Sequence, residues 1–473
     1  MILLFVVLNQ IRVIKMSLSI GQKLTCKSSK DTITVLKELG AGGQGTVYLV
    51  EGAISGKKAL KWYNDKTLGS SKQRDELWTS ISQIVGRPPE GDVNSSFAWL
   101  IELVEYGDKF GYIMDLVDHD KYIKILQVMT GKKQYQPTQQ MKTLISLNAV
   151  TAFAKLHASG YCYRDISEDN IRFDIKSGNI KILDNDNAGF EQSSKSSVLG
   201  TRDYMAPEIL RGEVLPSKHT DYHSLATFLF RLWMWSYPLY GAKALALRCW
   251  DKKAIAKVFG HEAFIFDKTD TSNALPYEDD GDDFTYVHDF WKACPKQLQD
   301  LFSETFGIGL NNPARRVIET RWIKVFGLMY DTITICPNDQ SENFWNDDKQ
   351  GGEHKIKCWK CKKEYKAPPR LKIKNKNNNV QISTLIVKPA THLLARHMNT
   401  LVEAKNAQNI LGTMVQHPTD KTMWGLRNES GSDWIFINSK KEEVPIPKGR
   451  SVPAINGNTV NFGNGYIGTF ESS

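Results

Sequence analysis

The stretch that decides the fold reads YRDISEDN at residues 163–170 and, after a short turn, IKILDND at residues 180–186. Asp165, Asn170 and Asp184 stand there in the order and at the spacing that phosphoryl transfer requires. One carboxylate can accept the proton of an attacking hydroxyl, and the amide and second carboxylate can hold the magnesium ions that neutralise nucleotide phosphates. The stretch therefore predicts Asp165 as a catalytic base and Asn170 and Asp184 as magnesium ligands.

A glycine-rich turn lies well upstream, where residues 39–48 read LGAGGQGTVY. The turn has the form G-x-G-x-x-G-x-V, in which the glycines let the backbone approach phosphates and the valine covers the adenine. Alone the pattern is a weak signal, because glycine-rich hairpins are common. The nucleotide-binding residues that it offers are Gly40, Gly42, Gly43, Gly45 and Val47.

A lysine follows this turn where a phosphate ligand is expected. Ala59 and Lys61 lie on the third expected strand, from which a lysine can bind the α- and β-phosphates. Such a lysine needs a helix carboxylate to hold it, and Glu76 is the best candidate, with Asp75 as the second choice. The alternative is that these acids are surface charges. We predict Lys61, braced by Glu76, as part of the catalytic site.

Hydrophobic periodicity divides the chain up to residue 330 into two parts. Residues 31–66 and 96–117 read as strands with turns, residues 70–85 have helical spacing, and the pattern after about residue 140 is helical. We expect a β-rich lobe, then a larger helical lobe, with the phosphoryl-transfer residues between them. The backbone that would bind the adenine edge is expected at Met114, Asp115 and Val117.

Composition bounds the remaining possibilities. The 473 residues are 41% hydrophobic, which is ample for buried cores, and the formal net charge is +9. Residues 355–376 hold ten Lys/Arg against one Glu, so the basic balance is local and nucleic acid is not the expected partner. Seven mostly isolated cysteines favour a reducing cytoplasm over a disulfide framework.

The N-terminal segment is not expected to cross a membrane. Its apolar run at residues 2–8 falls far short of the roughly 20 residues that a spanning helix needs. Residues 1–15 are either an upstream extension of the coding start or an element packed on the first lobe. We treat residues 1–30 as an N-terminal extension.

With these motifs in hand, residues 31–330 resemble the eukaryotic-like protein serine/threonine kinases. The resemblance implies an α+β chain with the bilobal kinase fold: a β-rich N-lobe at 31–117 and a helical C-lobe at 118–330. It implies ATP and Mg²⁺ as cofactors and protein substrates, with Thr201 favouring Ser/Thr over Tyr acceptors. Further matches are GTRDYMAPE at 200–208, DYHS at 221–224, whose Asp221 would brace the catalytic loop, and NPARR at 312–316, whose Arg316 would pair with Glu208.

Three departures from that family's pattern bear on activity. Tyr163 replaces a histidine that mainly packs, Asn185-Asp186 replaces the Phe-Gly whose packing sets active and inactive states, and Ser167 replaces a phosphate-contacting lysine. Losing that positive charge could slow the reaction. The alternative reading is therefore a pseudokinase scaffold that binds nucleotide without transferring phosphate.

The activation segment contains a cluster of serines. In the family, an arginine such as Arg164 can pair with a phosphate on this segment. We predict that autophosphorylation among Ser193, Ser194, Ser196 and Ser197 orders the loop, the alternative being a flexible polar loop.

A narrower resemblance, to a bacterial subgroup, rests on YRDIS, DNDN and the FIFD of residues 264–267. That subgroup joins the kinase to a zinc-ribbon-like segment and a forkhead-associated-like β-domain. Its relatives accompany a type 2C phosphatase and a von Willebrand A domain protein in stress and defence gene clusters. The resemblance implies such partners, and a role in stress or phage-defence signalling, for this chain.

The segments after residue 330 are assigned accordingly. Residues 331–365 read as a degenerate zinc ribbon, in which Cys336, Cys358 and Cys361 would bind structural Zn²⁺ with Asp339 or His354 as a fourth ligand. The alternative is a decayed ribbon packed around Trp359. Residues 366–380 read as a basic linker, and residues 381–473 as a forkhead-associated-like, β-sandwich-like domain, in which Arg427 is either a phosphate ligand or a structural salt bridge.

Overall fold

The N-lobe is a closed antiparallel β-barrel flanked by two helices. The computed structural model describes residues 17–89, 95–190, 200–345, 355–389, 391–398, 409–438, 440–463 and 465–472. The barrel strands follow the order β1-β2-β3-β4-β6-β5, and β1 closes it by pairing with both β2 and β5. The elements are β1 (Lys23–Cys26), β2 (Thr32–Ala41), β3 (Gly45–Gly52), β4 (Gly56–Tyr63), α1 (Asp65–Leu68), α2 (Ser71–Gly86), β5 (Leu100–Tyr106) and β6 (Lys109–Met114).

The barrel corrects the predicted start of the first lobe. Residues 1–30 were expected to be an extension, but Leu24 and Cys26 of β1 are buried in the barrel core. Alternating burial along this four-residue strand is the pattern of a half-buried strand, and its shortness hid it in the sequence. Residues 1–15 lie outside the described residues.

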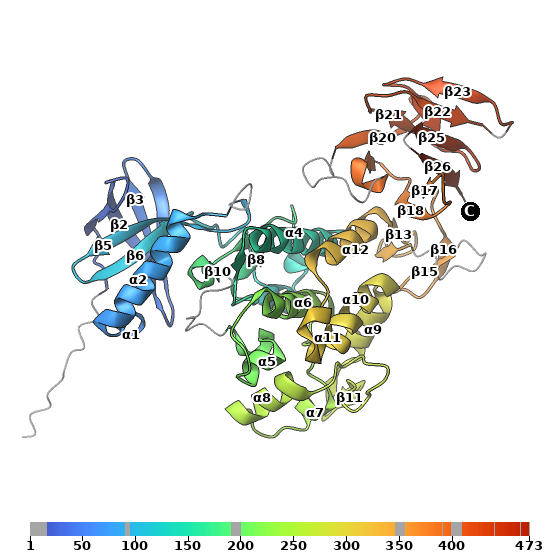
Figure 1. The fold of residues 1–473 in the computed structure, drawn as a ribbon. Helices are drawn as coiled ribbons and strands as arrows, with labels where there is room; N and C mark the ends of the chain where they lie inside the picture. The colour runs from blue at the N-terminus through green and yellow to red at the C-terminus, as the bar shows by residue number, and fades with distance from the viewer. Residues whose placement is uncertain are drawn as a thin grey trace, which may run out of the picture.

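The C-lobe is built around α6 (Lys218–Met234), whose residues from Thr220 to Met234 are almost all buried. A helix that is buried on all sides forms the centre of a domain, and α4 (Gln139–Ala158), α10 (Lys296–Phe306) and α12 (Glu319–Asp331) surround it. Figure 1 shows these helices as one body beside the N-lobe barrel. The remaining helices are α3 (Ile125–Met129), α5 (Pro207–Leu210), α7 (Ala242–Leu245), α8 (Lys252–His261), α9 (Thr285–Ala293) and α11 (Ile308–Asn311).

Short strands at the lobe junction carry the residues of interest. β8 (Ile171–Phe173) pairs with β9 (Ile180–Ile182), and β7 (Tyr161–Cys162) pairs with β10 (Gly189–Phe190). The turn η3 (Asn185–Asn187) follows β9, and η4 (Arg202–Tyr204) precedes α5. In the acidic insert, β11 (Glu278–Asp279) and β12 (Asp282–Asp283) form a small hairpin. Among the described helices, none combines the length and the apolar character needed to cross a membrane.

Two hairpins follow the C-lobe: β13 (Ile333–Ile335) with β14 (Glu342–Phe344), and β15 (Lys355–Lys357) with β16 (Glu364–Lys366). A C-terminal domain of two antiparallel sheets comes next, ordered β18-β17-β26-β25-β22-β23 and β19-β20-β21-β24, around one shared apolar core. Its strands are β17 (Arg370–Asn375), β18 (Gln381–Ile386), β19 (His392–Leu394), β20 (Ile410–Gln416), β21 (Trp424–Asn428), β22 (Trp434–Ile437), β23 (Glu443–Ile446), β24 (Ser451–Pro453), β25 (Thr459–Gly463) and β26 (Tyr466–Glu471).

The predicted basic linker at residues 366–380 is wrong. Strand β17 occupies its centre and pairs on both sides, with β18 and β26. Leu371 and Ile373 are fully buried there, while Lys372 and Lys374 are half-buried between them, so the many lysines concealed an alternating strand. Residues 370–375 therefore belong to the C-terminal domain.

The C-terminal domain is attached to the last C-lobe helix through a buried ion cluster. Asp331, at the end of α12, accepts hydrogen bonds from Arg396 at 2.8 and 2.9 Å and interacts with His397 at 2.9 Å. Arg396 and His397 belong to the turn η7 (Ala395–His397). In Figure 1 this domain lies at the side of the helical lobe away from the N-lobe.

Candidate functional site

Asp165 lies on the loop between β7 and β8 and is fixed by three side chains. Its Oδ1 accepts a hydrogen bond from the Thr201 hydroxyl at 2.8 Å, and its Oδ2 accepts bonds from the amides of Asn170 at 3.0 Å and Asn187 at 3.4 Å. Burial raises the pKa of Asp165, although the hydrogen bonds from Thr201 and Asn170 oppose that shift. The carboxylate therefore has a fixed orientation and a raised basicity, which suit a proton acceptor.

The loop carrying Asp165 is held by Asp221 of α6. The carboxylate of Asp221 accepts the backbone N–H of Tyr163 at 2.5 Å and that of Arg164 at 2.9 Å. The bracing role expected of Asp221 is thus visible as two hydrogen bonds. The ring of Tyr163 is buried edge-on against Phe153, and its hydroxyl donates to the Leu183 carbonyl. Tyr163 therefore packs and braces, as predicted for this replacement of histidine.

The predicted pair of Glu208 and Arg316 is present. The two guanidinium NH₂ groups of Arg316 each contact one carboxylate oxygen of Glu208 at 2.7 Å, and the arginine side chain is fully buried. Such a bidentate buried pair is strong and directional. It ties the end of the activation segment at α5 to the turn before α12.

Lys61 projects from β4 toward the loop after β9. Its Nζ lies 2.9 Å from Asp186, 3.3 Å from Asp184 and 2.8 Å from the side-chain oxygen of Gln44. Burial alone would lower the pKa of Lys61, but the charges of Asp186 and Asp184 outweigh it and the pKa is raised. The ammonium group therefore stays charged, as a phosphate ligand must.

The predicted brace from Glu76 is not formed in this structure. Lys61 makes its ion pairs with Asp186 and Asp184, whereas Glu76 and Asp75 both lie on the exposed side of α2. Ile81 and Ile84 are the buried residues of this helix, and they set its rotation. Glu76 is exposed, whereas the next residues, Leu77 and Trp78, are half-buried on the inward side.

The glycine-rich turn covers Lys61 from the β2–β3 side. Gly45 is required by close packing, since a Cβ there would lie 2.2 Å from the Trp62 carbonyl oxygen. A Cβ at Gly40, Gly42 or Gly43 would meet nothing within 4 Å, so the backbone at these positions is open to a ligand. This arrangement fits the predicted phosphate-binding role.

The predicted adenine-binding residues line the junction of β4 and β6. Ala59 and Met114 are directly paired across the two strands and are both buried. Val47 is paired with Lys61 on the neighbouring strand, Val117 is buried, and exposed Asp115 forms an ion pair with Lys58 at 2.7 Å. Strand pairing thus places Ala59, Met114 and Val47 close to Lys61, and the binding of adenine there stays a prediction.

The residues expected to hold magnesium fit that role chemically. Asp184 sits in the left-handed region at φ 50° and its side chain is 43% exposed, so its carboxylate is accessible to a cation. Asn170 donates from its amide nitrogen to Asp165, which leaves its amide oxygen as the ligand atom. A carboxylate and an amide oxygen are ligands that Mg²⁺ accepts.

Ser167 and Asn185, two of the residues that depart from the family's pattern, are both buried in the interior of this chain. Ser167 is fully buried and places no charge in the site. Asn185 is also fully buried, and its amide donates to the carbonyls of Ala98 at 2.7 Å and Ile182 at 3.1 Å. The loop is thus anchored by polar bonds where the related kinases use an aromatic ring.

Arg164 donates to the Phe190 carbonyl at 3.2 Å. The predicted phosphorylation sites Ser193, Ser194, Ser196 and Ser197 lie outside the described residues.

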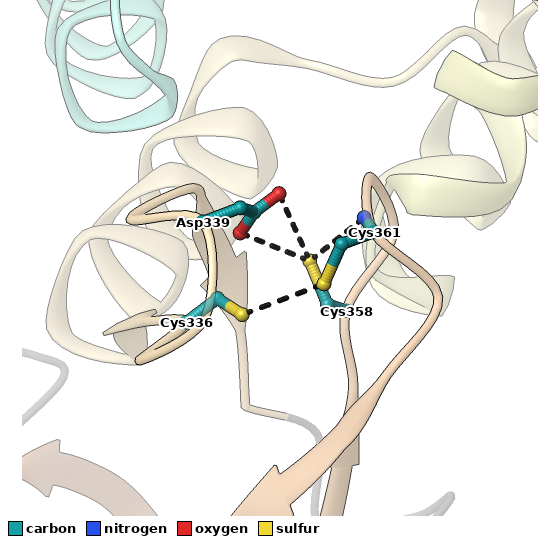
Figure 2. A group of neighbouring side chains, drawn as sticks. All are labelled: Cys336, Asp339, Cys358 and Cys361. Carbon is teal, nitrogen blue, oxygen red and sulfur yellow. Dashed lines mark hydrogen bonds between the residues drawn. The ribbon is translucent and has the colours of Figure 1, made fainter.

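A second cluster joins the two hairpins after the C-lobe. Figure 2 shows Cys336 and Asp339 from the β13–β14 turn facing Cys358 and Cys361 from the β15–β16 turn. Their ligand atoms all lie within 4.8 Å of one another. The sulfurs of Cys336 and Cys361 are 3.7 Å apart, close to the roughly 3.8 Å edge of a tetrahedron with Zn–S bonds of about 2.3 Å. Of the two proposed fourth ligands, Asp339 is in place and His354 lies outside the described residues.

The two turns of this cluster have the same backbone geometry. The N–H groups of Gln340 and Lys362 return to the carbonyls of Cys336 and Cys358, at 2.9 and 3.0 Å, and both residues have positive φ. Asp339 therefore occupies the place that Cys361 holds in the other turn. The sulfur of Cys358 also accepts the Cys361 N–H at 3.4 Å, a contact that favours a thiolate.

Sequence reasoning missed several residues that the structure brings to Lys61 and Asp165. Asp186 was noticed only as part of a departure from the usual motif, and Gln44 only as a loop residue. Tyr63, which donates to Asp186 at 2.7 Å, and Asn187 carried no signal in the sequence. For Asp186, the signal in the sequence was a carboxylate two residues after the expected metal ligand Asp184.

Comparison with known proteins agrees with this geometry. A model of the protein kinase domain matches residues 33–301, more than half of the chain. The probable cAMP-dependent protein kinase catalytic subunit of Encephalitozoon cuniculi is 27% identical over 217 residues, covering 45% of this chain and 63% of that protein. Developmentally-regulated protein kinase 1 of Dictyostelium discoideum is 33% identical over 136 residues, covering 28% of this chain and 18% of that protein.

A bacterial relative is also similar. The serine/threonine-protein kinase PrkC of Bacillus subtilis is 25% identical over 217 residues, covering 45% of this chain and 32% of that protein. The matched region thus spans less than two thirds of the length of each of these three relatives. With the glycine-rich turn, the catalytic loop and the Glu208–Arg316 pair all in place, the chain belongs to the protein kinase family.

Proposed function

We propose that this chain is an ATP-dependent protein kinase that phosphorylates serine and threonine hydroxyls of protein substrates. The observation that carries the proposal is the hydrogen bond from Thr201 to Asp165, in a site that also contains Lys61 and Asp184. Thr201 orients the base from the activation segment, as serine/threonine-selective enzymes require. Family membership supports the reaction class, and the specific acceptor remains to be identified.

Each residue has a defined task in this proposal. Asp165 orients the acceptor hydroxyl and takes its proton, while Lys61 and the backbone of the glycine-rich turn hold the nucleotide phosphates. Magnesium, held by Asn170 and Asp184, would neutralise the charge on the transferring phosphoryl group. Most of the rate enhancement would then come from alignment and charge neutralisation.

The direct test is incubation of the purified chain with γ-labelled Mg-ATP and a generic basic acceptor protein. We expect label on phosphoserine or phosphothreonine, and no label with Asp184→Ala, whose folding is checked by thermal unfolding. Wild-type chain that binds ATP but transfers no label would instead support a nucleotide-binding pseudokinase scaffold. The buried Ser167, which supplies no charge for the transferring phosphate, is the feature that favours this second candidate.

We also propose that Cys336, Asp339, Cys358 and Cys361 bind one structural zinc ion. Three cysteine sulfurs and one carboxylate within 4.8 Å of one another support zinc, and four protein ligands would complete a tetrahedral structural site. Metal analysis of protein purified without added zinc should give about one equivalent per chain. A Cys358→Ser variant should lose the metal, and a wild-type content near zero would refute the site.

We infer the wider setting from the resemblance to the bacterial subgroup. Free cysteines and a thiolate metal site support a reducing, cytoplasmic location. The two-sheet C-terminal domain supports a forkhead-associated-like module, although Arg427 pairs with Glu429 at 2.6 Å, which favours a structural role for that arginine. A type 2C phosphatase and a von Willebrand A protein are the proposed partners in stress or phage-defence signalling. Co-purification of this chain with each proposed partner, with an unrelated phosphatase as the control, tests these two interactions.

A further inference from the structure

The carboxylate that holds Lys61 comes from an unexpected part of the chain. In related kinases, this lysine is held by a glutamate on the helix of the N-lobe. Here the carboxylate nearest to the Lys61 ammonium is that of Asp186, at 2.9 Å, and it follows the expected metal ligand by two residues. Both partners are almost completely buried, with the Lys61 side chain 5% exposed and the Asp186 side chain 4% exposed.

The position of Asp186 is itself fixed. Its Oδ2 accepts a hydrogen bond from the Tyr63 hydroxyl at 2.7 Å, and Tyr63 lies on β4 two residues after Lys61. Alternate residues of a strand face the same side of the sheet, so the side chains of Lys61 and Tyr63 approach Asp186 together. Asp186 thus binds two side chains of the N-lobe barrel from a loop of the C-lobe.

The loop that carries Asp186 is anchored at the residues before and after it. The amide of Asn185 donates to the Ala98 carbonyl at 2.7 Å, and the amide of Asn187 reaches Asp165 at 3.4 Å. The exposed carboxylate of Asp184 faces the solvent side. The DNDN sequence therefore connects Lys61, through Asp184 and Asp186, with the base, through Asn187.

We propose that Asp186 replaces the helix glutamate as the positioning residue for Lys61. The proposal rests on the assignment of Lys61 as a nucleotide-phosphate ligand. Asp184 is then left to bind the metal, because its more distant and more exposed carboxylate is the weaker partner of the lysine. The hold on Lys61 depends on the loop and not on the placement of α2, whose Glu76 is exposed.

The test measures Mg-ATP binding in wild type and Asp186→Asn, with the fold of each variant checked by thermal unfolding. Asp186→Asn should weaken binding at least tenfold, because Lys61 loses the carboxylate that orients it toward the nucleotide phosphates. On a Lys61→Met background the same change should have little further effect, since residues that act through one contact are not additive. Glu51→Gln, an exposed change on β3, is the matched control for charge loss.

Two further variants complete the test. Asp186→Glu, which keeps the charge, should recover part of the affinity that Asp186→Asn loses, and Glu76→Gln should weaken Mg-ATP binding much less than Asp186→Asn does. Unchanged affinity in Asp186→Asn, a larger loss in Glu76→Gln, or the same further loss on the Lys61→Met background would overturn the inference. If Asp186→Asn fails to fold, Asp186→Glu and Glu76→Gln decide, because weaker binding in Glu76→Gln alone would assign the helix carboxylate as the partner. Wild type that binds no Mg-ATP would overturn the nucleotide site itself.

Discussion

His157, near the end of α4, should make the stability of the C-lobe depend on pH. Its Nε2 lies 3.0 Å from Asp221 Oδ2 and its Nδ1 contacts Glu319, while its side chain is 5% exposed. Burial alone would lower the pKa of this imidazole, but the hydrogen bonds that it donates to the carboxylates of Asp221 and Glu319 raise it to about 9. The charged ring thus joins the residue that braces the catalytic loop to the start of α12.

The size of the effect follows from that pKa. The ordinary value of 6.5 rises to about 9 in the folded chain, and each unit corresponds to about 1.4 kcal/mol, which gives an order of about 3 kcal/mol. Because the folded pKa is the higher one, this stabilisation is complete below about pH 6.5 and is lost as the pH rises through about 9. At about 2–4 °C per kcal/mol, the thermal midpoint should fall by about 6–12 °C.

The assay is thermal unfolding between pH 6 and pH 10 for wild type and His157→Gln. The variant should unfold at a lower temperature at pH 6, and the gap between the two midpoints should narrow as the pH rises through about 9. The other titratable groups affect the thermal stability of both chains equally, so their contribution cancels in the difference between the two midpoints. A difference between the two thermal midpoints that stays constant with pH, or an NMR titration that places the His157 pKa near 6.5, would contradict this pH dependence.

Two further substitutions test buried ion pairs. Arg316→Met should destabilise the C-lobe by about 3–5 kcal/mol, because it leaves the Glu208 carboxylate buried without its partner, and adding Glu208→Gln should recover part of the loss in the same unfolding assay. A double variant no more stable than Arg316→Met would contradict this. Asp331→Asn should weaken the attachment of the C-terminal domain and speed its proteolytic release from the C-lobe, since Arg396 and His397 lose their shared carboxylate. Unchanged release would show that other contacts hold the domain.

The sequence predicted the kinase lobes because their key residues occur as local motifs. Asp165, Asn170 and Asp184 stand in one short stretch, whereas the pairing of Glu208 with Arg316 was implied by the resemblance to the protein kinases. Such residues act through the backbone geometry of their own loops. A pattern within a few residues is therefore enough to locate them, even though it cannot show the ligand that they bind.

The partner of Lys61 could not be located in this way, because it depends on the rotation of a helix. Glu76 is exposed on α2, where Ile81 and Ile84 are the buried residues, and the helical spacing of residues 70–85 did not show which carboxylate would reach Lys61. The replacement, Asp186, is far from Lys61 in sequence and reaches it only when the two lobes meet. A long-range contact of this kind needs the folded chain.

Amino-acid composition is a poor guide to the structure after residue 365. The lysines of β17 suggested a solvated linker, yet Arg370 is fully buried, with its guanidinium over the ring of Trp345 at 4.3 Å and paired with Glu471 at 2.7 Å. Charge therefore does not exclude a residue from a packed strand when a carboxylate and an aromatic ring receive it. In the metal cluster, Asp339 was one of two proposed fourth ligands, and only the turn geometry favours it.

The proposed function requires that this chain transfers phosphate and does not only bind nucleotide. Mg-ATP binding and single-turnover phosphoryl transfer, measured side by side in wild type and Asp165→Asn, separate these two possibilities. We expect equal binding in the two chains and transfer slower by about 10²–10⁴-fold in the variant, the usual contribution of a general base. Equal transfer rates in the two chains, or binding without transfer in wild type, would contradict it.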